Sequence, residues 1–485
     1  MKLYSETGDF KLYQGNMLDM LEDIQPNSID SIVTDPPYGL TSITKRFGAE
    51  NSAPNVYGKD GSFARLTKGF MGKAWDGSGI EYNVEAWRKC WQVLKHGGYL
   101  LAFGGTRTFH RIACAIEDAG FEIRDTIMWL YGSGFPKSLN IGLMIDKKNG
   151  IESPVVAKGR SGAAESHSVC ITGDDFGGEY EIRQAQNEWA GWGTALKPAY
   201  EPVIVARKPC EGSCIDNVMQ YRTGAINIDE CRVGDELIKG GTMPVMGSGE
   251  QGVCEFNTIG AERAEGADHV GKYPSNVILT YDETDADEVC GGMPNTKGTD
   301  NLRINSNDGK NYNCYGNYGD CVTTGYADEG SAARYFYCAK ASKRDRDEGL
   351  EAFIEQRTTD GSLRCNEDTA RMFGANSSLH RNTHTTVKPC NLMQYLVRLV
   401  TPRGGIILDP FNGSGSTGKA AMYENKDRQA NYRYIGIELT KEYLPIADAR
   451  IRYASNNNVP IETLDKPLAG QVTFDDLLTG GAQTD

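Results

Sequence analysis

Alternation of strand-like and helix-like segments at both ends of the chain limits its fold more than any other feature. Trp87, Trp91 and Leu94 fall at i, i+4 and i+7 and form the apolar stripe of a helix that Gly97-Gly98 should end. Short apolar runs between such helices are typical of strands buried on both faces, so the pattern predicts a parallel sheet with helices on both faces. The expected strands cover 11–14, 29–34, 99–103, 122–130, 406–408 and 434–439. The other expected helices cover 108–119, 392–400, a segment ending at 423 and one ending near 451.

The middle of the chain, from about residue 140 to 383, does not follow this alternation. It is dense in Gly, Asn, Thr and Asp, and its strand-like pieces at 201–206, 276–280 and 334–338 are short. A structureless connection of that size is implausible inside a compact domain. We therefore expect an insertion with a small core of its own, and a poorly ordered polar, acidic tail beyond residue 455.

Composition indicates a soluble, loop-rich protein. The 485 residues include 57 glycines, 39% are hydrophobic, and the mean hydropathy is -0.47. No run approaches the roughly 18 apolar residues of a membrane span, and the start MKLYSETGDF contains no hydrophobic signal segment. The 13 cysteines are therefore expected to be reduced thiols of a cytoplasmic protein. Cys210, Cys214, Cys231 and Cys254 form no paired C-x-x-C set, and the 6 histidines show no ligand spacing, so we expect no metal site.

The net charge of -14 argues against a protein that coats nucleic acid along its length. Binding at one surface depends only on the local field, however. Two basic groups offer such a field, although charge runs of this kind are as often solvated faces. The groups are Lys45, Arg46, Lys59, Arg65, Lys68 and Lys73, and Lys340, Lys343, Arg344 and Arg346.

The segment Asp35-Pro36-Pro37-Tyr38, at the end of the strand 29–34, is the strongest candidate for a catalytic site. The Asp35 carboxylate and a proline carbonyl offer two acceptors for the two hydrogens of one exocyclic amino group. Pro36 and Pro37 lack backbone N–H donors and have a fixed φ, so they hold these acceptors stiffly. Tyr38 presents an aromatic face on which a base pulled out of a duplex can stack. The alternative is an edge strand that ends in a proline turn.

A second candidate site is the glycine-rich segment 409–418, which follows the strand 406–408 and opens a helix. Gly413 and Gly415 allow the backbone to turn tightly and approach a ligand, and the helix start supplies free N–H groups. Glu438 lies about 20 positions further on, where doubly wound nucleoside-binding folds place a carboxylate for ribose hydroxyls. A nicotinamide or flavin enzyme is disfavoured because the third glycine of G-x-G-x-x-G is missing, and a P-loop because no Gly-Lys-Ser/Thr follows.

Together the two segments resemble the amino-group DNA methyltransferases, which combine an Asp-Pro-Pro-Tyr catalytic loop with a Phe-x-Gly-x-Gly loop for S-adenosylmethionine. Their order is similar to the permuted β class, because the catalytic loop comes first and Phe411 follows Asp35 by 376 positions. The resemblance implies an α/β fold with a three-layer, Rossmann-like, circularly permuted methyltransferase sheet and a large inserted target-recognition domain. The implied division is 1–139 for the catalytic half, 140–383 for the recognition region, 384–454 for the cofactor-binding half and 455–485 for the tail.

Two shorter segments add to this resemblance. Residues 382–389 resemble the family's Asn-x-His-Pro-Thr-x-Lys-Pro motif, with Thr385 in place of the proline and Lys388 retained. Residues 12–16 resemble its Gly-Asp segment, whose aspartate contacts the cofactor adenine. Asn16 stands in place of that aspartate, and its side-chain carbonyl can accept the same hydrogen bond. The implied cofactor-binding residues are Asn16, Lys388, Asp409, Phe411, Asn412, Gly413, Ser414, Gly415 and Glu438.

The resemblance implies site-specific DNA methylation of the restriction-modification kind, with Asp35, Pro36, Pro37 and Tyr38 as catalytic residues. In this family an aspartate at the first motif position usually accompanies N6-adenine and a serine N4-cytosine, so Asp35 favours adenine. N4-cytosine methylation, a decayed homologue that only binds DNA, and RNA or protein substrates remain as alternatives. Segments similar to those of phage and prophage adenine methylases occur at 131–138, 193–198 and 335–341.

The expected partner is double-stranded DNA with one base flipped out of the duplex. The resemblance also allows a homodimer. No membrane association is expected, and the expected location is the cytoplasm of a bacterium or of a phage-infected cell. The recognition sequence does not follow from the insertion, because base contacts depend on which side chains reach the groove.

Overall fold

A computed structural model of the chain describes residues 2–39, 79–131, 138–160, 179–238, 268–280, 343–353, 381–384 and 386–455, and short strand segments elsewhere. The chain divides into two compact units, one formed by Met1–Asn227 with Ala339–Asp485 and the other by Ile228–Cys338. The predicted recognition region, 140–383, is therefore shared between the two units. Among the described residues, no helix is both long enough and apolar enough to span a bilayer.

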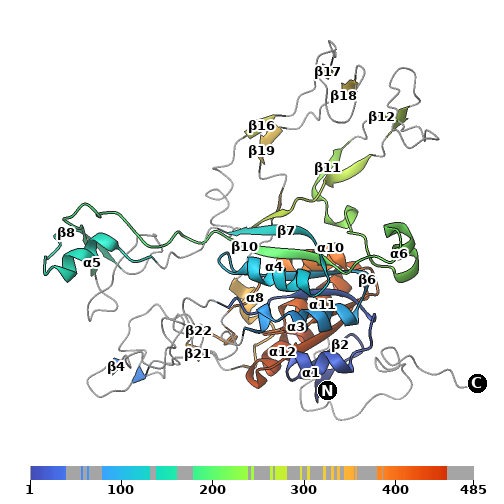
Figure 1. Cartoon of the computed structure of the whole chain (residues 1–485), viewed down its shortest axis with the longest axis horizontal. Coiled ribbons are helices and arrows are strands. Elements are labelled where there is room, and N and C mark those ends of the chain that lie inside the picture. Colours follow the sequence, from blue (N-terminus) through green and yellow to red (C-terminus); the bar gives the residue numbers. More distant parts are fainter. Residues whose placement is uncertain are drawn as a thin grey trace, which may run out of the picture. The chain divides into compact units, whose positions relative to one another are not determined.

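The first unit carries the elements that alternate along the sequence (Figure 1). Its strands are β1 (Lys2–Glu6), β2 (Phe10–Gln14), β3 (Ile29–Thr34), β4 (Val56–Tyr57), β5 (Phe63–Ala64), β6 (Leu94–Phe103), β7 (Glu122–Tyr131), β8 (Val155–Arg160), β9 (Glu179–Arg183), β10 (Tyr200–Arg207), β21 (Gln356–Arg357), β22 (Leu379–His380), β23 (Ile406–Asp409) and β24 (Arg433–Glu438). Its α-helices are α1 (Met17–Met20), α3 (Val84–Val93), α4 (Phe109–Asp118), α5 (Ile141–Lys148), α6 (Cys214–Tyr221), α8 (Lys343–Asp347), α10 (Cys390–Val400), α11 (Ser416–Arg428) and α12 (Leu444–Ala454).

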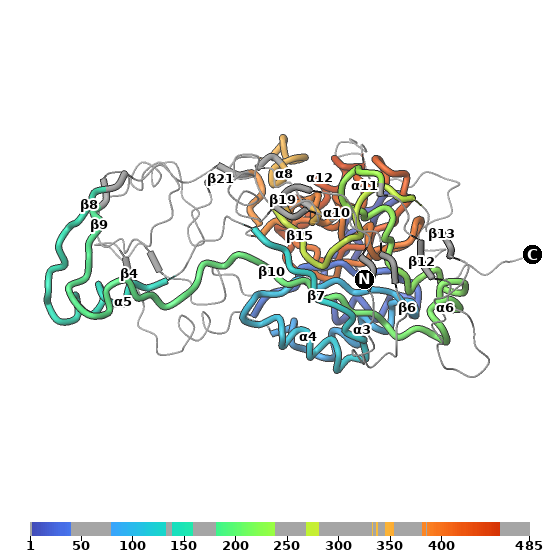
Figure 2. The backbone as a smooth tube through the Cα atoms, turned by 90° about the horizontal axis from the view of Figure 1, so that it is seen from above, coloured from blue at the N-terminus to red at the C-terminus, as the bar shows by residue number. Residues whose placement is uncertain are grey.

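The main sheet of this unit has the strand order β1-β2-β24-β23-β3-β6-β10-β7. The pairs from β2 through β24, β23 and β3 to β6 are parallel, whereas β10 is antiparallel to both β6 and β7. Figure 2 shows α3 and α4 on one side of the sheet and α10, α11 and α12 on the other. The predicted parallel sheet with helices on both faces is thus confirmed, with β1 and β10 as antiparallel additions.

The register of the sheet places three predicted loops at one edge. Thr34 ends β3, Asp409 ends β23 and Glu438 ends β24, and these strands are neighbours in the sheet. Ligands bind beyond the carboxyl ends of the strands in open α/β sheets. Strand order therefore brings the segment after Asp409 beside the segment after Thr34, although they are far apart in the sequence.

Most predicted element bounds agree with the structure, and three predictions differ from it. Leu94 was predicted to be helical, but α3 ends at Val93 and Leu94 begins β6. Because Leu94 is fully buried, its apolar character fits either element. The helix expected to end at residue 423 continues to Arg428, where Gln429 closes it in the left-handed conformation. The strand 201–206, expected in the insertion, lies inside the main sheet as β10.

The core below this edge of the sheet is apolar and closely packed. Trp87 of α3 is fully buried and packs in one cluster with Ile112 of α4 and with sheet residues such as Ile32 and Leu408. The cluster ties the two halves of the predicted permuted domain together, because Ile32 precedes the insertion and Leu408 follows it. A fully buried leucine or isoleucine contributes roughly 1.5–3 kcal/mol, so this core stabilises the sheet that carries the site.

The second unit consists of short strands. These are β11 (Val233–Ile238), β12 (Thr242–Pro244), β13 (Arg263–Glu265), β14 (His269–Lys272), β15 (Val277–Thr280), β16 (Asn295–Lys297), β17 (Arg303–Asn305), β18 (Cys321–Thr323), β19 (Glu329–Ser331) and β20 (Tyr337–Cys338). β11 pairs with β14 in antiparallel fashion, and β15 pairs with β20 in parallel. The acidic tail and the first basic group, Lys45 to Lys73, lie outside the described residues.

Candidate active site

The predicted catalytic loop follows β3 and is held from two sides. Pro36 and Pro37 are buried, and Asp35 and Tyr38 are partly buried. The Thr108 hydroxyl donates to the Tyr38 carbonyl at 2.6 Å, and the Tyr82 hydroxyl donates to the same carbonyl at 3.2 Å. Two side chains from other elements therefore fix the backbone of a loop that its prolines already stiffen.

Lys388 joins the catalytic loop to the other half of the domain. Its ammonium donates to Asp35 Oδ2 at 2.7 Å and to the Tyr38 hydroxyl at 2.9 Å. It lies 4.8 Å from the centre of the Phe103 ring, and its side chain is 7% exposed. Burial lowers the pKa of Lys388, but the charges of Asp35 and Glu201 outweigh burial and raise it. Lys388, which was predicted to bind the cofactor, thus contacts Asp35, the predicted catalytic aspartate.

Glu201 is a site residue that the sequence did not indicate. Its Oε2 accepts from the Tyr38 hydroxyl at 2.7 Å and lies 3.3 Å from Lys388 Nζ. It reaches the site because β10 inserts between β6 and β7. The one sequence signal for Glu201 is that it is an acidic residue near the start of β10, a strand that is otherwise mostly apolar.

The two carboxylate oxygens of Asp35 differ. Oδ2 accepts from Lys388, whereas Oδ1 is buried and has no hydrogen-bond partner within the described residues. A buried carboxylate oxygen without a donor costs free energy, so such an atom points to a ligand that donates to it. The ion pair with Lys388 fixes which oxygen is left for that donor.

The glycine-rich loop after β23 adopts the close approach that its glycines predict. Gly413 has φ 52° and Gly415 has φ 75°, both in the left-handed region. A Cβ added to Gly413 would lie 2.9 Å from His384 Nε2. Burial lowers the pKa of His384 to about 3, so its ring is neutral and accepts close packing against the loop. His384 belongs to the predicted segment 382–389, whose Thr385 lies outside the described residues.

Asp409 and Asn412 hold this loop from inside. The Asp409 carboxylate accepts from Thr34 Oγ1 at 2.6 Å, from Thr417 Oγ1 at 2.8 Å and from the Phe411 N–H at 3.1 Å. Asn412 Oδ1 accepts from the Tyr434 hydroxyl at 2.7 Å. Burial raises the pKa of Asp409 to about 6. Both side chains face the protein, and Asp409 links the cofactor loop directly to the last residue of β3.

The remaining predicted cofactor residues lie around the same loop. Glu438 accepts from the Gly413 N–H at 2.7 Å and from the Thr440 N–H at 2.7 Å. Phe411 packs on Trp87, with ring centres 6.1 Å apart. Asn16 is exposed, and its side-chain oxygen accepts from the Leu18 N–H at 3.1 Å as the N-cap of α1. That oxygen therefore already has a donor.

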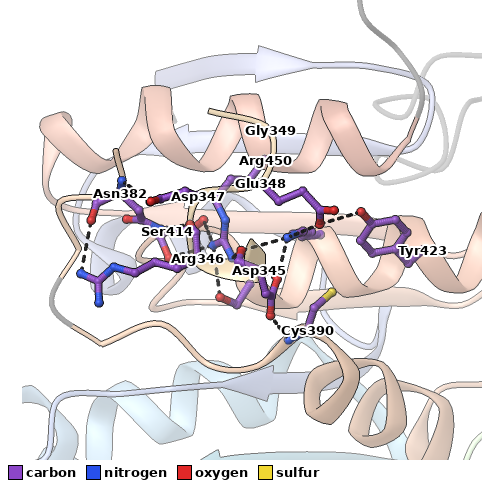
Figure 3. A network of polar contacts seen from close by, with 12 residues as sticks. Asp345, Arg346, Asp347, Glu348, Gly349, Asn382, Cys390, Ser414, Tyr423 and Arg450 are labelled. Carbon is purple, nitrogen blue, oxygen red and sulfur yellow. Dashed lines mark hydrogen bonds and ion pairs between the residues drawn. The ribbon is translucent and has the colours of Figure 1, made fainter. Parts of the chain in front are cut away.

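Ser414 is held by a buried arginine in a network of charges (Figure 3). Arg450 donates to the Ser414 carbonyl at 2.7 Å and to its hydroxyl at 2.9 Å. Asp345 lies 2.6 Å from Lys419 Nζ and 3.8 Å from Arg450, and it accepts from the Cys390 N–H. The sequence missed this network because nothing in α8 distinguishes its charges from a solvated run.

The second basic group contributes to this network as well. Arg346 donates to the His384 carbonyl at 2.7 Å. Burial lowers the pKa of Arg346. Arg346 therefore holds the segment 382–389 and is not part of a solvated basic face. Within the described parts of the chain, no group of three or more His, Cys, Asp or Glu side chains is arranged to hold a metal ion.

Comparison with known proteins agrees with this arrangement. The family model for DNA methylases of the N6/N4 type matches residues 29–222 and 284–449, which is well over half of the chain. The chain belongs to this DNA methylase family. The two matched ranges contain the predicted catalytic loop and the glycine-rich loop, and the gap between them, 223–283, falls largely within the unit Ile228–Cys338.

Individual relatives are similar over shorter stretches. The Type II methyltransferase M.HindIII of Haemophilus influenzae is 25% identical over 233 residues, which are 44% of this chain and 64% of that protein. The Type II methyltransferase M2.DpnII of Streptococcus pneumoniae is 40% identical over 75 residues, 16% of this chain and 26% of that protein. The chain thus spans less than two thirds of the length of these relatives.

Among solved structures, the cytosine-N4-specific PvuII DNA methyltransferase aligns with a TM-score of 0.36 and 11% identity, covering 92% of this chain and 86% of that one. A complex of M1.HpyAVI with S-adenosylmethionine aligns with a TM-score of 0.31 and 14% identity, covering 91% of this chain and 98% of that one. Likeness at this level carries no argument about individual residues.

Glu438 gives the stability of this methylase family member a measurable pH dependence. Burial raises the pKa of Glu438 from 4.5 to about 7, although the N–H groups of Thr440 and Gly413 oppose the shift. The folded state then holds this proton more tightly than the unfolded state does. The contribution of Glu438 to the free energy of unfolding should therefore fall, by about 3 kcal/mol, as pH rises from the unfolded pKa to the folded one. Urea unfolding at a series of pH values measures this slope.

In Glu438→Gln the free energy of unfolding should fall less, or rise more, between these two pH values than in the wild type. Asp409, whose pKa is also raised, and His384, whose pKa is lowered and acts in the opposite direction, contribute to the slope of both proteins. An unchanged slope in the variant would show that Glu438 does not titrate in this range.

Proposed function

We propose that the chain transfers a methyl group from S-adenosylmethionine to the N6 amino group of an adenine in double-stranded DNA. The observation that carries the proposal is Oδ1 of Asp35, which is buried and has no hydrogen-bond partner among the residues that the structure describes, in the loop that follows β3 beside β23. An acceptor without a donor fits an amino group, which has two hydrogens to donate. Membership in the DNA methylase family supports this reaction.

The residues around the glycine-rich loop fit a nucleoside cofactor. Gly413 and Gly415 bring the backbone close to whatever lies above it, and any side chain at Gly413 would collide with His384. The Glu438 carboxylate, 8% exposed, retains lone pairs for hydroxyl donors beyond the two N–H groups that it accepts. We propose Phe411, Asn412, Gly413, Ser414, Gly415 and Glu438 as the binding residues, with Asp409 in a supporting role. When bound, S-adenosylmethionine supplies a methyl group on a positively charged sulfur.

Asp35 would prepare the nitrogen for attack. The lone pair of an aromatic amine is delocalised into the ring, which makes the nitrogen a poor nucleophile. Hydrogen bonds from the amino group to Asp35 Oδ1 and to the Pro36 carbonyl favour a tetrahedral nitrogen with a localised lone pair. Because Lys388, Thr108 and the prolines hold the acceptors, little reorganisation is needed during the reaction.

Access to the amino group requires the base to leave the duplex, since the reacting atom is inside the stack. The ring of Tyr38 would then support the flipped base. The Tyr38 hydroxyl is tied to Glu201 and Lys388, so the ring keeps one orientation.

We propose that the region 140–383 contacts the surrounding DNA. A homodimer stays a prediction that light scattering can check.

Mass spectrometry of methylated DNA tests the function. Purified protein would be incubated with amplified, unmodified genomic DNA and S-adenosylmethionine carrying a labelled methyl group. After digestion, label in N6-methyladenosine supports the proposal, whereas label in N4-methylcytidine would correct the base and keep the reaction. No label on DNA under any condition would contradict the proposed function.

A further inference from the structure

We infer that Glu201 is a positioning residue that acts through Lys388. The negative charge of Glu201 offsets the positive charge of Lys388, so that the charge of Asp35 remains effective at the reacting amine. The inference rests on the proposed methyl transfer and adds a residue to that site. Glu201 lies on β10, outside both sequence motifs, and reaches the site through the sheet.

Three charged side chains meet at this point. Lys388 Nζ lies 2.7 Å from Asp35 Oδ2 and 3.3 Å from Glu201 Oε2. Lys388 is 7% exposed, whereas Asp35 and Glu201 are 21% and 22% exposed. The ammonium is therefore the most buried of the three charges, and the two carboxylates are the more exposed.

The charge balance matters because methyl transfer moves a positive charge. As the new N–C bond forms and the S–C bond breaks, the positive charge passes from sulfur to the amine nitrogen, which afterwards loses a proton to water. A negative field at the nitrogen favours this step. Lys388 and Asp35 alone have no net charge, so the pair would provide little field. With Glu201 the cluster carries one net negative charge.

Glu201 also holds the Tyr38 hydroxyl, at 2.7 Å, and a purely structural role must be separated from the electrostatic one. Glutamine at position 201 keeps an oxygen of the same reach that can accept from Tyr38. It removes only the charge. Aspartate keeps the charge on a shorter side chain. The two variants therefore separate charge from hydrogen bonding.

The experiment measures kcat and KM of the full-length chain for DNA and for S-adenosylmethionine. Glu201→Gln should lower kcat about tenfold to a hundredfold, and both KM values should stay within about twofold of wild type. The expected loss of kcat is smaller than that for removing a fully buried catalytic group, because the Glu201 side chain is partly exposed. Glu201→Asp should recover part of the loss. The control is Glu117→Gln, which replaces an exposed acid of α4 and should leave kcat unchanged.

A double-mutant cycle with Lys388→Met adds a second test. If Glu201 acts by balancing Lys388, its replacement should matter much less once the ammonium is gone, so the two losses should be non-additive by at least about tenfold. Additive losses, or a Glu201→Gln enzyme with wild-type kcat, would overturn the inference. Failure of the proposed function is a separate result, since the wild-type chain itself would then transfer no methyl group to DNA.

Discussion

Asp35→Ala should abolish methyl transfer, with a loss of about a thousandfold or more in kcat, while the protein stays folded. In the proposed mechanism the removed carboxylate is the acceptor that localises the amine lone pair, and it is the nearest negative charge to the nitrogen. Removing one preorganised group of this kind typically costs about a hundredfold to a thousandfold, and Asp35 combines two such effects. Incorporation of labelled methyl groups into DNA measures the loss.

The fold should tolerate this replacement because the remaining charges stay paired. Lys388 keeps Glu201 at 3.3 Å and the Tyr38 hydroxyl at 2.9 Å, so no buried ammonium is left without a partner. The matched control is Asp118→Ala, an exposed aspartate of α4, which should have wild-type activity. If Asp35→Ala incorporates methyl groups as fast as the wild type, the proposed mechanism is wrong.

Asp345→Ala should destabilise the cofactor-binding half by about 3–5 kcal/mol, the usual cost of breaking a buried ion pair on one side. Asp345 lies 2.6 Å from Lys419 Nζ and 3.8 Å from Arg450, and both cations are fully buried (Figure 3). Without Asp345, Lys419 keeps an ion pair with Glu348 at 2.9 Å, and this single carboxylate must then compensate the charges of both Lys419 and Arg450. Urea unfolding followed by circular dichroism measures the change as a lower midpoint.

The same replacement should weaken cofactor binding, because Arg450 orients Ser414 through two hydrogen bonds. Asp345→Asn, which keeps one acceptor oxygen but loses the charge, should show an intermediate loss of stability. Asp427→Ala is the matched control, since this aspartate is exposed near the end of α11. A midpoint for Asp345→Ala equal to that of the control would mean that the network does not stabilise this half.

Several elements could be predicted because their causes are local. The strands ending at Thr34 and Glu438 follow from short apolar runs bounded by turn residues, and the structure confirms them. The left-handed conformations of Gly413 and Gly415 follow from the need to turn between a strand and a helix. The end of α3 could not be predicted, since the buried Leu94 fits the apolar pattern of either a helix or a strand.

The sequence by itself determined which loops are the candidates for the chemistry, because Asp35 to Tyr38 and the segment 409–418 combine residue types whose conformations and hydrogen-bonding groups are set within a few positions. Tertiary structure decided how those loops are completed. Lys388 reaches Asp35 across 353 positions, and Glu201 reaches Tyr38 across 163. Both contacts depend on sheet order, on β23 lying beside β3 and on β10 inserting between β6 and β7. Sheet order is set by packing of the whole core, which no local pattern of residues records.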